Sequence, residues 1–384
     1  MLQTAHRLQH INEYYFSKKL REIEALNQQG KNIISLAIGS PDLPPHPDVI
    51  KVLQETAADP ASHGYQGYKG IAPLRSAMAN WYKTWYHVEL DPAKEVLPLM
   101  GSKEGIMHIC MTYLNPGDKV LVPDPGYPTY ASNVTLAGAA VVPYTLKAEN
   151  NWYPDFATME KNGLDGVKLM FVNYPHMPTG QPASMDILEK LVAFAQQHRI
   201  LLVHDNPYSF ILNDNPVSLL SVPGAMDVAI ELNSLSKSHN MAGWRVGMLL
   251  AKPERINDIL RFKSNMDSGM FLPLQLAATK ALSLAKDWHG SVNKIYEERR
   301  TKVYELLDIL DCRYSKEQVG MFMWAKIPGT YKDCYEMADD ILYNKNVFVT
   351  PGGIFGREGE QYIRVSLCGS IEKLEEAIRR IKGN

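Results

Sequence analysis

Seven short stretches of apolar residues, rich in Val, Ile and Leu, divide the first two thirds of the chain. They lack regular polar alternation, which is typical of strands buried on both faces of a sheet. Segments with helical spacing lie between many of them, and residues 185–198 place Ile187, Leu191 and Ala195 on one face. This alternation predicts an α/β fold with a mostly parallel sheet between two layers of helices. The predicted strands are residues 96–100, 120–122, 140–142, 169–172, 200–203, 228–232 and 246–251.

The pattern changes after about residue 285. A long charged helical stretch comes first, three strand-like segments follow, and a strongly amphipathic helix closes the chain; these are residues 287–310, 320–327, 347–350, 362–367 and 371–381. We therefore predict a large domain at residues 45–285 and a smaller α+β domain at 286–384. Residues 1–44, with a predicted helix at 16–28, form an N-terminal arm and part of the smaller domain.

Composition narrows the class of protein. The 384 residues carry 40 Lys and Arg against 42 Asp and Glu, so the basic excess expected of a nucleic-acid-binding protein is absent. No apolar segment approaches the roughly 18 residues of a membrane span, and the N-terminus lacks a secretory apolar region. The four cysteines are far apart and form no CxxC pair, which argues against a disulfide framework or a zinc site. We expect a cytoplasmic protein without a metal.

Ligands of parallel sheets bind beyond the carboxyl ends of the strands, so the residues that follow each strand are of special interest. Asp205 follows the strand at 200–203, where its carboxylate can hold a protonated ring nitrogen. Tyr208 offers a phenol three residues later. The alternative is a turn containing proline, with Asp205 as an ordinary turn residue.

Lys237 lies in a polar segment between two predicted buried strands. A desolvated lysine there can form a Schiff base, and the nearby Ser234, Ser236 and Arg245 suit a phosphate dianion. A solvated loop lysine is the alternative. Residues 101–106 open a helix at 104–114, whose free N–H groups, with Ser102 and Lys103, can bind an anion; Ser102 as a simple helix cap is the alternative.

These groups together meet the needs of pyridoxal phosphate, which requires a lysine, an acid at the pyridine nitrogen, a donor at the phenolic oxygen and a phosphate cradle. The chain resembles the class I/II aminotransferases of the aspartate aminotransferase superfamily, which are pyridoxal-phosphate enzymes of fold type I. The segment SLSKSHNMAGWRVG (234–247) is most similar to that of LL-diaminopimelate aminotransferases. Supporting segments are SLAIGSPDLPP (35–45), HGYQGYKGIAPLR (63–75), VPDPGYPTY (122–130), HDNPY (204–208) and QYIRVSLCGS (361–370).

The resemblance implies a role for each of these residues. Lys237 resembles the lysine that binds the cofactor and moves the α-proton, Asp205 the acid at the ring nitrogen, and Tyr208 the donor to the phenolic oxygen. The other implied cofactor contacts are the phosphate cradle of Ser102, Lys103, Ser234 and Arg245 and the stacking ring of Tyr127.

Substrate and subunit contacts are implied in the same way. Arg364 resembles the arginine that binds the substrate α-carboxylate, and Gly39 lies where a backbone N–H assists it. Tyr65 is similar to the tyrosine that reaches the phosphate of the neighbouring subunit, which implies a homodimer. The resemblance implies an aminotransferase that moves an amino group between an L-amino acid and a 2-oxo acid.

One position departs from the family, and two other functions stay open. The family usually has Asn directly before Pro-Thr-Gly, whereas this chain has Met177 after His176, and methionine has no hydrogen to donate. A carbon–sulfur β-elimination lyase would share the same lysine, acid and arginine. A non-enzymatic regulator usually carries a DNA-binding domain ahead of this fold, for which about 30 residues are too few.

Overall fold

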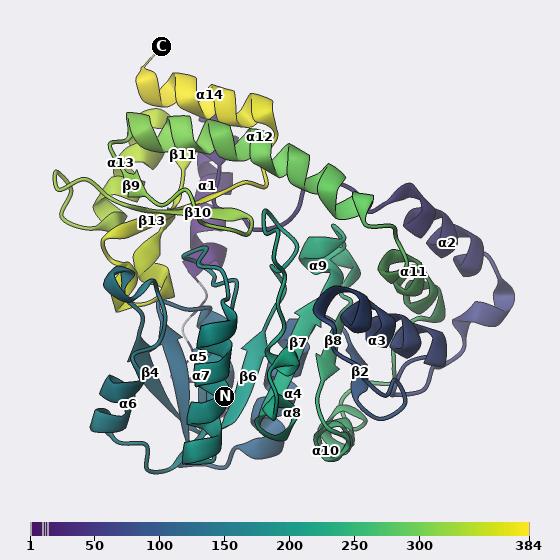
Figure 1. Ribbon diagram of the computed structural model, residues 1–384. Coiled ribbons are helices and arrows are strands. Elements are labelled where there is room, and N and C mark those ends of the chain that lie inside the picture. Colours follow the sequence, from purple (N-terminus) through teal and green to yellow (C-terminus); the bar gives the residue numbers. More distant parts are fainter. Residues whose placement is uncertain (1, 10, 12, 14, 384) are drawn as a thin grey trace.

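The computed structural model describes residues 2–9, 11, 13 and 15–383. A seven-stranded sheet lies at its centre, with strand order β2-β8-β7-β6-β5-β3-β4 (Figure 1). All neighbouring strands are parallel except for β8, which is antiparallel to β2 and β7. The seven predicted strands are confirmed as β2 (Val96–Leu99), β3 (Lys119–Asp124), β4 (Ala140–Thr145), β5 (Val167–Val172), β6 (Leu201–Asp205), β7 (Ala229–Ser234) and β8 (Gly247–Leu250).

Helices cover both faces of this sheet, because its strands are apolar on both sides. On one face, the buried core includes residues of α3 (Ala72–Tyr86), α7 (Met185–His198) and α11 (Leu272–Leu282). On the other, it includes residues of α4 (Ser102–Tyr113), α5 (Pro128–Leu136) and α10 (Pro253–Lys263). The shorter or peripheral helices of this part are α2 (Pro47–Ala57), α6 (Phe156–Asn162), α8 (Ala225–Val228) and α9 (Leu235–Ser238).

The last third of the chain builds a second, smaller sheet. Four antiparallel strands follow the order β12-β13-β10-β9, and a separate parallel pair joins β1 to β11. The short strands β1 and β9 have two residues each and were missed by the sequence pattern. These strands are β1 (Ile34–Ser35), β9 (Arg313–Tyr314), β10 (Phe322–Lys326), β11 (Val347–Phe348), β12 (Thr350–Pro351) and β13 (Tyr362–Ser366).

Four helices pack with the smaller sheet: α1 (Tyr15–Gln28), α12 (Asp287–Ile309), α13 (Cys334–Lys345) and α14 (Ile371–Lys382) (Figure 1). The N-terminal helix α1 joins this part through Lys19, whose ammonium lies 3.0 Å from the Asp339 carboxylate, and through Ile23, which packs near Leu342 and Phe348. The predicted domain boundaries stay predictions. In the described part of the chain, no helix is both long and apolar enough to cross a membrane.

Candidate active site

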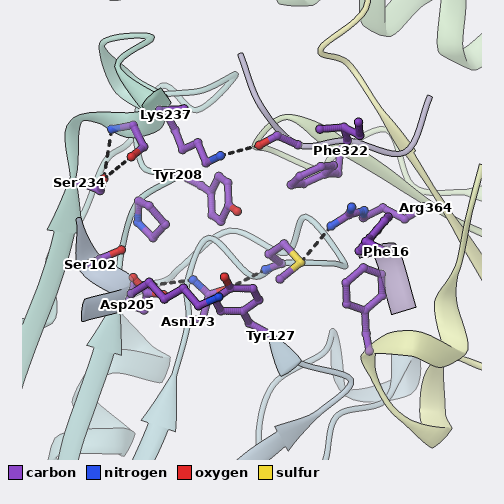
Figure 2. Close-up of a pocket in the computed structure, with 18 of the residues that line it drawn as sticks. Phe16, Ser102, Tyr127, Asn173, Asp205, Tyr208, Ser234, Lys237, Phe322 and Arg364 are labelled. Atoms are coloured by element: carbon purple, nitrogen blue, oxygen red, sulfur yellow. Dashed lines mark hydrogen bonds between the residues drawn. The ribbon is translucent and has the colours of Figure 1, made fainter. Parts of the chain in front are cut away.

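A cavity of about 570 Å³ opens where the carboxyl ends of β5, β6 and β7 face the smaller sheet and α1 (Figure 2). Residues from distant parts of the chain share it. Every sequence-predicted site residue except Tyr65 lines this cavity: Gly39, Ser102, Lys103, Tyr127, Asp205, Tyr208, Ser234, Lys237, Arg245 and Arg364.

Lys237 lies on the short helix α9, which begins directly after β7. The Ser234 hydroxyl caps α9 by accepting a hydrogen bond from the Ser236 N–H. The Lys237 side chain is partly buried, and its Nζ donates to the carbonyl oxygen of Gly39. Burial lowers the pKa of Lys237, and the charges of Arg364 and Arg245 lower it further. The lysine is thus not a solvated loop residue, and the neutral form of its amine is more populated than it would be in water.

Asp205 is the last residue of β6 and is 4% exposed, so it is not an ordinary turn residue. Its Oδ2 accepts a hydrogen bond of 2.9 Å from the Tyr130 hydroxyl, whereas its Oδ1 has no partner among the described residues. Burial raises the pKa of the Asp205 carboxyl to about 6. A buried carboxylate oxygen without a partner is stabilised most by a charged hydrogen-bond donor, and a protonated pyridine nitrogen is such a donor.

Asp205 gives the cofactor-free protein a specific pH dependence. Between pH 4 and 6 an unfolded Asp205 ionises while the folded one keeps its proton, so folding stability falls as pH rises through this window. We expect cofactor-free Asp205→Asn to lose this pH dependence. Above pH 6 its free energy of unfolding should be about 3 kcal/mol higher than that of the cofactor-free wild type. Urea unfolding from pH 4 to 7 measures the difference. Equal pH slopes for both proteins would contradict the assignment.

An anion cradle lies beside Asp205. The first turn of α4, Ser234 and Arg245 face the same cavity. Gly101, with a φ of +87°, caps α4, so Ser102 is the first helical residue rather than the cap. A Cβ on Gly101 would lie 2.1 Å from Nη2 of Arg245, so only glycine lets the guanidinium approach the helix start. Free N–H groups, a hydroxyl and a guanidinium together suit a phosphate.

Arg364 lies in the middle of β13 and is 5% exposed. Its Nη2 donates to the carbonyl of Ala37 at 2.9 Å, and its Nη1 lies 3.3 Å from the sulfur of Met177 (Figure 2). The guanidinium carbon lies 3.9 Å from the ring centre of Phe322, a close cation–π contact. A thioether sulfur and a backbone carbonyl are weaker acceptors than a carboxylate, which a guanidinium can bind with two parallel hydrogen bonds.

Met177 directs its sulfur towards Arg364. Of its two polar neighbours, Asn173 is engaged in hydrogen bonds elsewhere and His176 does not line the cavity. The Asn173 amide donates to the Asp205 carbonyl at 2.6 Å and accepts from the Met177 N–H at 2.8 Å. The buried His176 pairs its Nδ1 with the Thr179 hydroxyl at 2.8 Å. Tyr208, the phenol that the resemblance assigns to the phenolic oxygen of the cofactor, also lines the cavity.

Tyr65 does not join the other predicted residues. It is 95% exposed and lies outside the cavity. The sequence reasoning in turn missed Tyr130, although that residue belongs to the VPDPGYPTY segment, and it missed Phe16, Phe322 and Phe355. No local signal marks these three phenylalanines, because their place at Arg364 depends on the packing of distant segments.

The cavity fits pyridoxal phosphate on three structural observations: the unpartnered Oδ1 of Asp205, the close approach of Arg245 to Gly101 at the start of α4, and the desolvated amine of Lys237. The large sheet and its ligand-side edge are those of fold type I. The fold and the cavity thus define the class of pyridoxal-phosphate-dependent enzymes of fold type I.

Comparisons with known proteins identify the family. Residues 31–381 match Aminotransferase class I and II, and the chain belongs to this family. It is 40% identical to LL-diaminopimelate aminotransferase of Dehalococcoides mccartyi, over 99% of this chain and 98% of that protein. The same enzyme of Natranaerobius thermophilus is 39% identical over 99% of both chains.

Solved structures agree with this family. Substrate-bound BacF from Bacillus subtilis has a TM-score of 0.95 and 36% identity, covering 100% of this chain and 98% of that chain. Aspartate aminotransferase from Thermus thermophilus, at 24% identity and a TM-score of 0.92 over 99% of both chains, has the same fold. The chain is a pyridoxal-phosphate-dependent aminotransferase that moves an amino group between an amino acid and a 2-oxo acid.

Proposed function

We propose that Lys237 binds the cofactor covalently, that Asp205 holds its ring nitrogen, and that Arg364 receives the α-carboxylate of the amino acid. The observation that carries this proposal is that the desolvated amine of Lys237 and the guanidinium of Arg364 share one cavity with the unpartnered oxygen of Asp205. Bound pyridoxal phosphate supplies an electron sink for the bond that breaks at the substrate Cα.

The chain's own groups then handle the proton and the charges. The neutral Nζ of Lys237 takes the α-proton of the substrate, and the lowered pKa favours the free amine more than in a solvated lysine. The Asp205 carboxylate keeps a proton on the ring nitrogen through its free Oδ1. With the cofactor bound, the Tyr208 phenol would donate to its phenolic oxygen and the Tyr127 ring would contact its face; both side chains line the cavity.

Anion binding uses the two ends of the cavity. Ser102, Lys103, Ser234 and Arg245 hold the phosphate at the start of α4. At the other end, the Arg364 fork exchanges the Met177 sulfur and the Ala37 carbonyl for the substrate carboxylate. The Gly39 backbone N–H assists there.

A homodimer completes the proposal. Tyr65 is almost fully exposed and lies outside its own cavity, as expected of a side chain that reaches the phosphate of a partner subunit. A location in the cytoplasm also stays a prediction. LL-diaminopimelate is a candidate amino donor, favoured by the 40% identity to enzymes named for it.

A panel of amino donors tests the proposed function. We expect the holoenzyme to convert 2-oxoglutarate or pyruvate into the matching amino acid with at least one L-amino acid donor. Chromatographic detection of both products measures this exchange. Release of pyruvate from a sulfur amino acid without any 2-oxo acid acceptor would point to the β-elimination lyase instead.

Met177 predicts a change in the bound cofactor itself. An amide at this position would add a donor to the ionised phenolic oxygen and so favour the deprotonated cofactor. We expect Met177→Asn to lower the pH midpoint of the cofactor absorbance titration by about one unit, the effect of about 1.4 kcal/mol. Met177→Leu, which adds no donor, is the matched control. An unshifted midpoint in Met177→Asn would contradict this prediction, because it would mean that the new amide adds no hydrogen bond to the phenolic oxygen.

A further inference from the structure

Apolar side chains surround the Arg364 end of the cavity. The guanidinium carbon of Arg364 lies 4.6 Å from the ring centre of Phe355 and 5.8 Å from that of Phe16. Figure 2 shows Phe16 and Phe322 beside Arg364. Leu20 and Ile38 line the same cavity. We call Phe16, Leu20 and Ile38 the N-terminal wall, because all three precede residue 40.

Ile38 lies between the two groups proposed to hold an amino acid. The carbonyl of Ala37 accepts from Arg364, and the carbonyl of Gly39 accepts from Lys237. A substrate with its carboxylate at Arg364 and its amino group near Lys237 therefore has its Cα close to Ile38. Its side chain is then expected to meet the N-terminal wall.

Charged groups that could recognise a charged side chain are absent from this end of the described cavity. Asp205 is the one carboxylate among the lining residues, and it lies at the opposite side from Arg364 (Figure 2). Lys103, a cation of the lining, belongs to the start of α4, where the phosphate is proposed to bind. A distal ammonium or carboxylate beside the N-terminal wall would gain no ionic partner from the described lining residues, whereas an apolar side chain would bury surface against the wall.

The surface that carries Tyr65 has the same character. Tyr65 itself lines a separate, smaller cavity together with His63, Gln66, Met270 and Phe271, and none of the residues that line it is Asp or Glu. If a partner subunit contributes this surface, it adds no carboxylate from these residues either.

We infer that the preferred amino acids carry a large uncharged side chain, aromatic or branched aliphatic, and that the N-terminal wall selects them. This inference rests on the proposed function of Lys237 and Arg364. It differs from LL-diaminopimelate, whose distal carbon carries an ammonium and a carboxylate together. The selectivity follows from burial of apolar area against the wall and from the missing ionic partner.

Binding of unreactive acids tests the inference without turnover. We expect the holoenzyme to bind 3-phenylpropionate and 4-methylvalerate at least about tenfold more tightly than glutarate, as measured by calorimetry and by the change in cofactor absorbance. The donor panel should rank phenylalanine and leucine above glutamate and LL-diaminopimelate. Tighter binding of glutarate, as expected if Lys103 held a distal carboxylate, would overturn the inference.

Two variants with the same change in charge localise the effect. Ile38 is 46% exposed and Ile295 on α12 is 37% exposed, so both positions tolerate a long side chain, and only Ile38 lines the cavity. Ile38→Arg should bind glutarate about tenfold more tightly and 3-phenylpropionate more weakly. Ile295→Arg should change neither affinity. Equal responses of the two variants would overturn the role of the wall.

The outcomes also separate the inference from the proposed function. If the enzyme catalyses transamination but prefers charged donors, the roles of Lys237 and Arg364 stand and only the inferred selectivity is refuted. No binding of any acid, together with no turnover of any donor, refutes both.

Discussion

Lys237→Ala is expected to lower the rate of transamination by about 10⁴-fold or more, because it removes both the covalent attachment of the cofactor and the base for the α-proton. The partly buried Nζ makes its hydrogen bond to the Gly39 carbonyl, and burial keeps its pKa low. Among the described residues the Lys237 side chain forms no ion pair, so its removal is not expected to unfold the protein. Single-turnover kinetics with the best donor of the panel measure the loss.

Two measurements separate chemistry from folding in this variant. Borohydride reduction followed by peptide mass spectrometry should find the cofactor on residue 237 of the wild type and on no lysine of Lys237→Ala. Added ethylamine should restore part of the proton transfer in the variant. Lys263 provides the control, because it is 1% exposed and pairs with Asp267 outside the cavity. Lys263→Ala should melt at a lower temperature yet keep the covalent cofactor.

Arg364→Lys is expected to reduce kcat/KM for amino acids by about 100-fold, which corresponds to about 2–3 kcal/mol. An ammonium cannot form the two parallel hydrogen bonds of a guanidinium, and it stacks less well on Phe322. Most of the loss should appear in KM, because the carboxylate contact is made before the chemical step. Steady-state kinetics with the first-ranked donor measure this change.

A carboxylate role for Arg364 has a signature that a purely structural role lacks. The wild type should bind 3-phenylpropionate far more tightly than the neutral 3-phenylpropanamide, and Arg364→Lys should narrow this gap. Arg299 is the matched control, since it is 4% exposed and its guanidinium forms a bidentate pair with Asp42 at 2.7 and 2.8 Å. Arg299→Lys should lower stability while the preference for the carboxylate persists. An unchanged preference in Arg364→Lys would refute the role.

Most of the large sheet could be predicted from the sequence, since strands buried on both faces need continuous apolar stretches and leave a local pattern. Two-residue strands such as Ile34–Ser35 are too short for any such pattern. The sequence also marked Asp205 and Lys237 as chemistry-bearing residues, because polar groups that follow buried strands stand out from their surroundings. Arg245 was marked because it belongs to the same polar segment as Lys237. Their roles with the cofactor stay proposals until the variants are made.

The linear chain by itself determined the α/β architecture, the family likeness and the set of polar residues at the strand ends, because each depends on neighbours within a few positions. Only the tertiary structure decided where Met177 points and what surrounds Arg364. The sulfur of Met177 meets a guanidinium 187 residues away, and rings from α1, β10 and the segment before β13 gather around the same group. Such contacts leave no periodic trace, since packing of the complete chain, rather than local backbone preference, brings these side chains together.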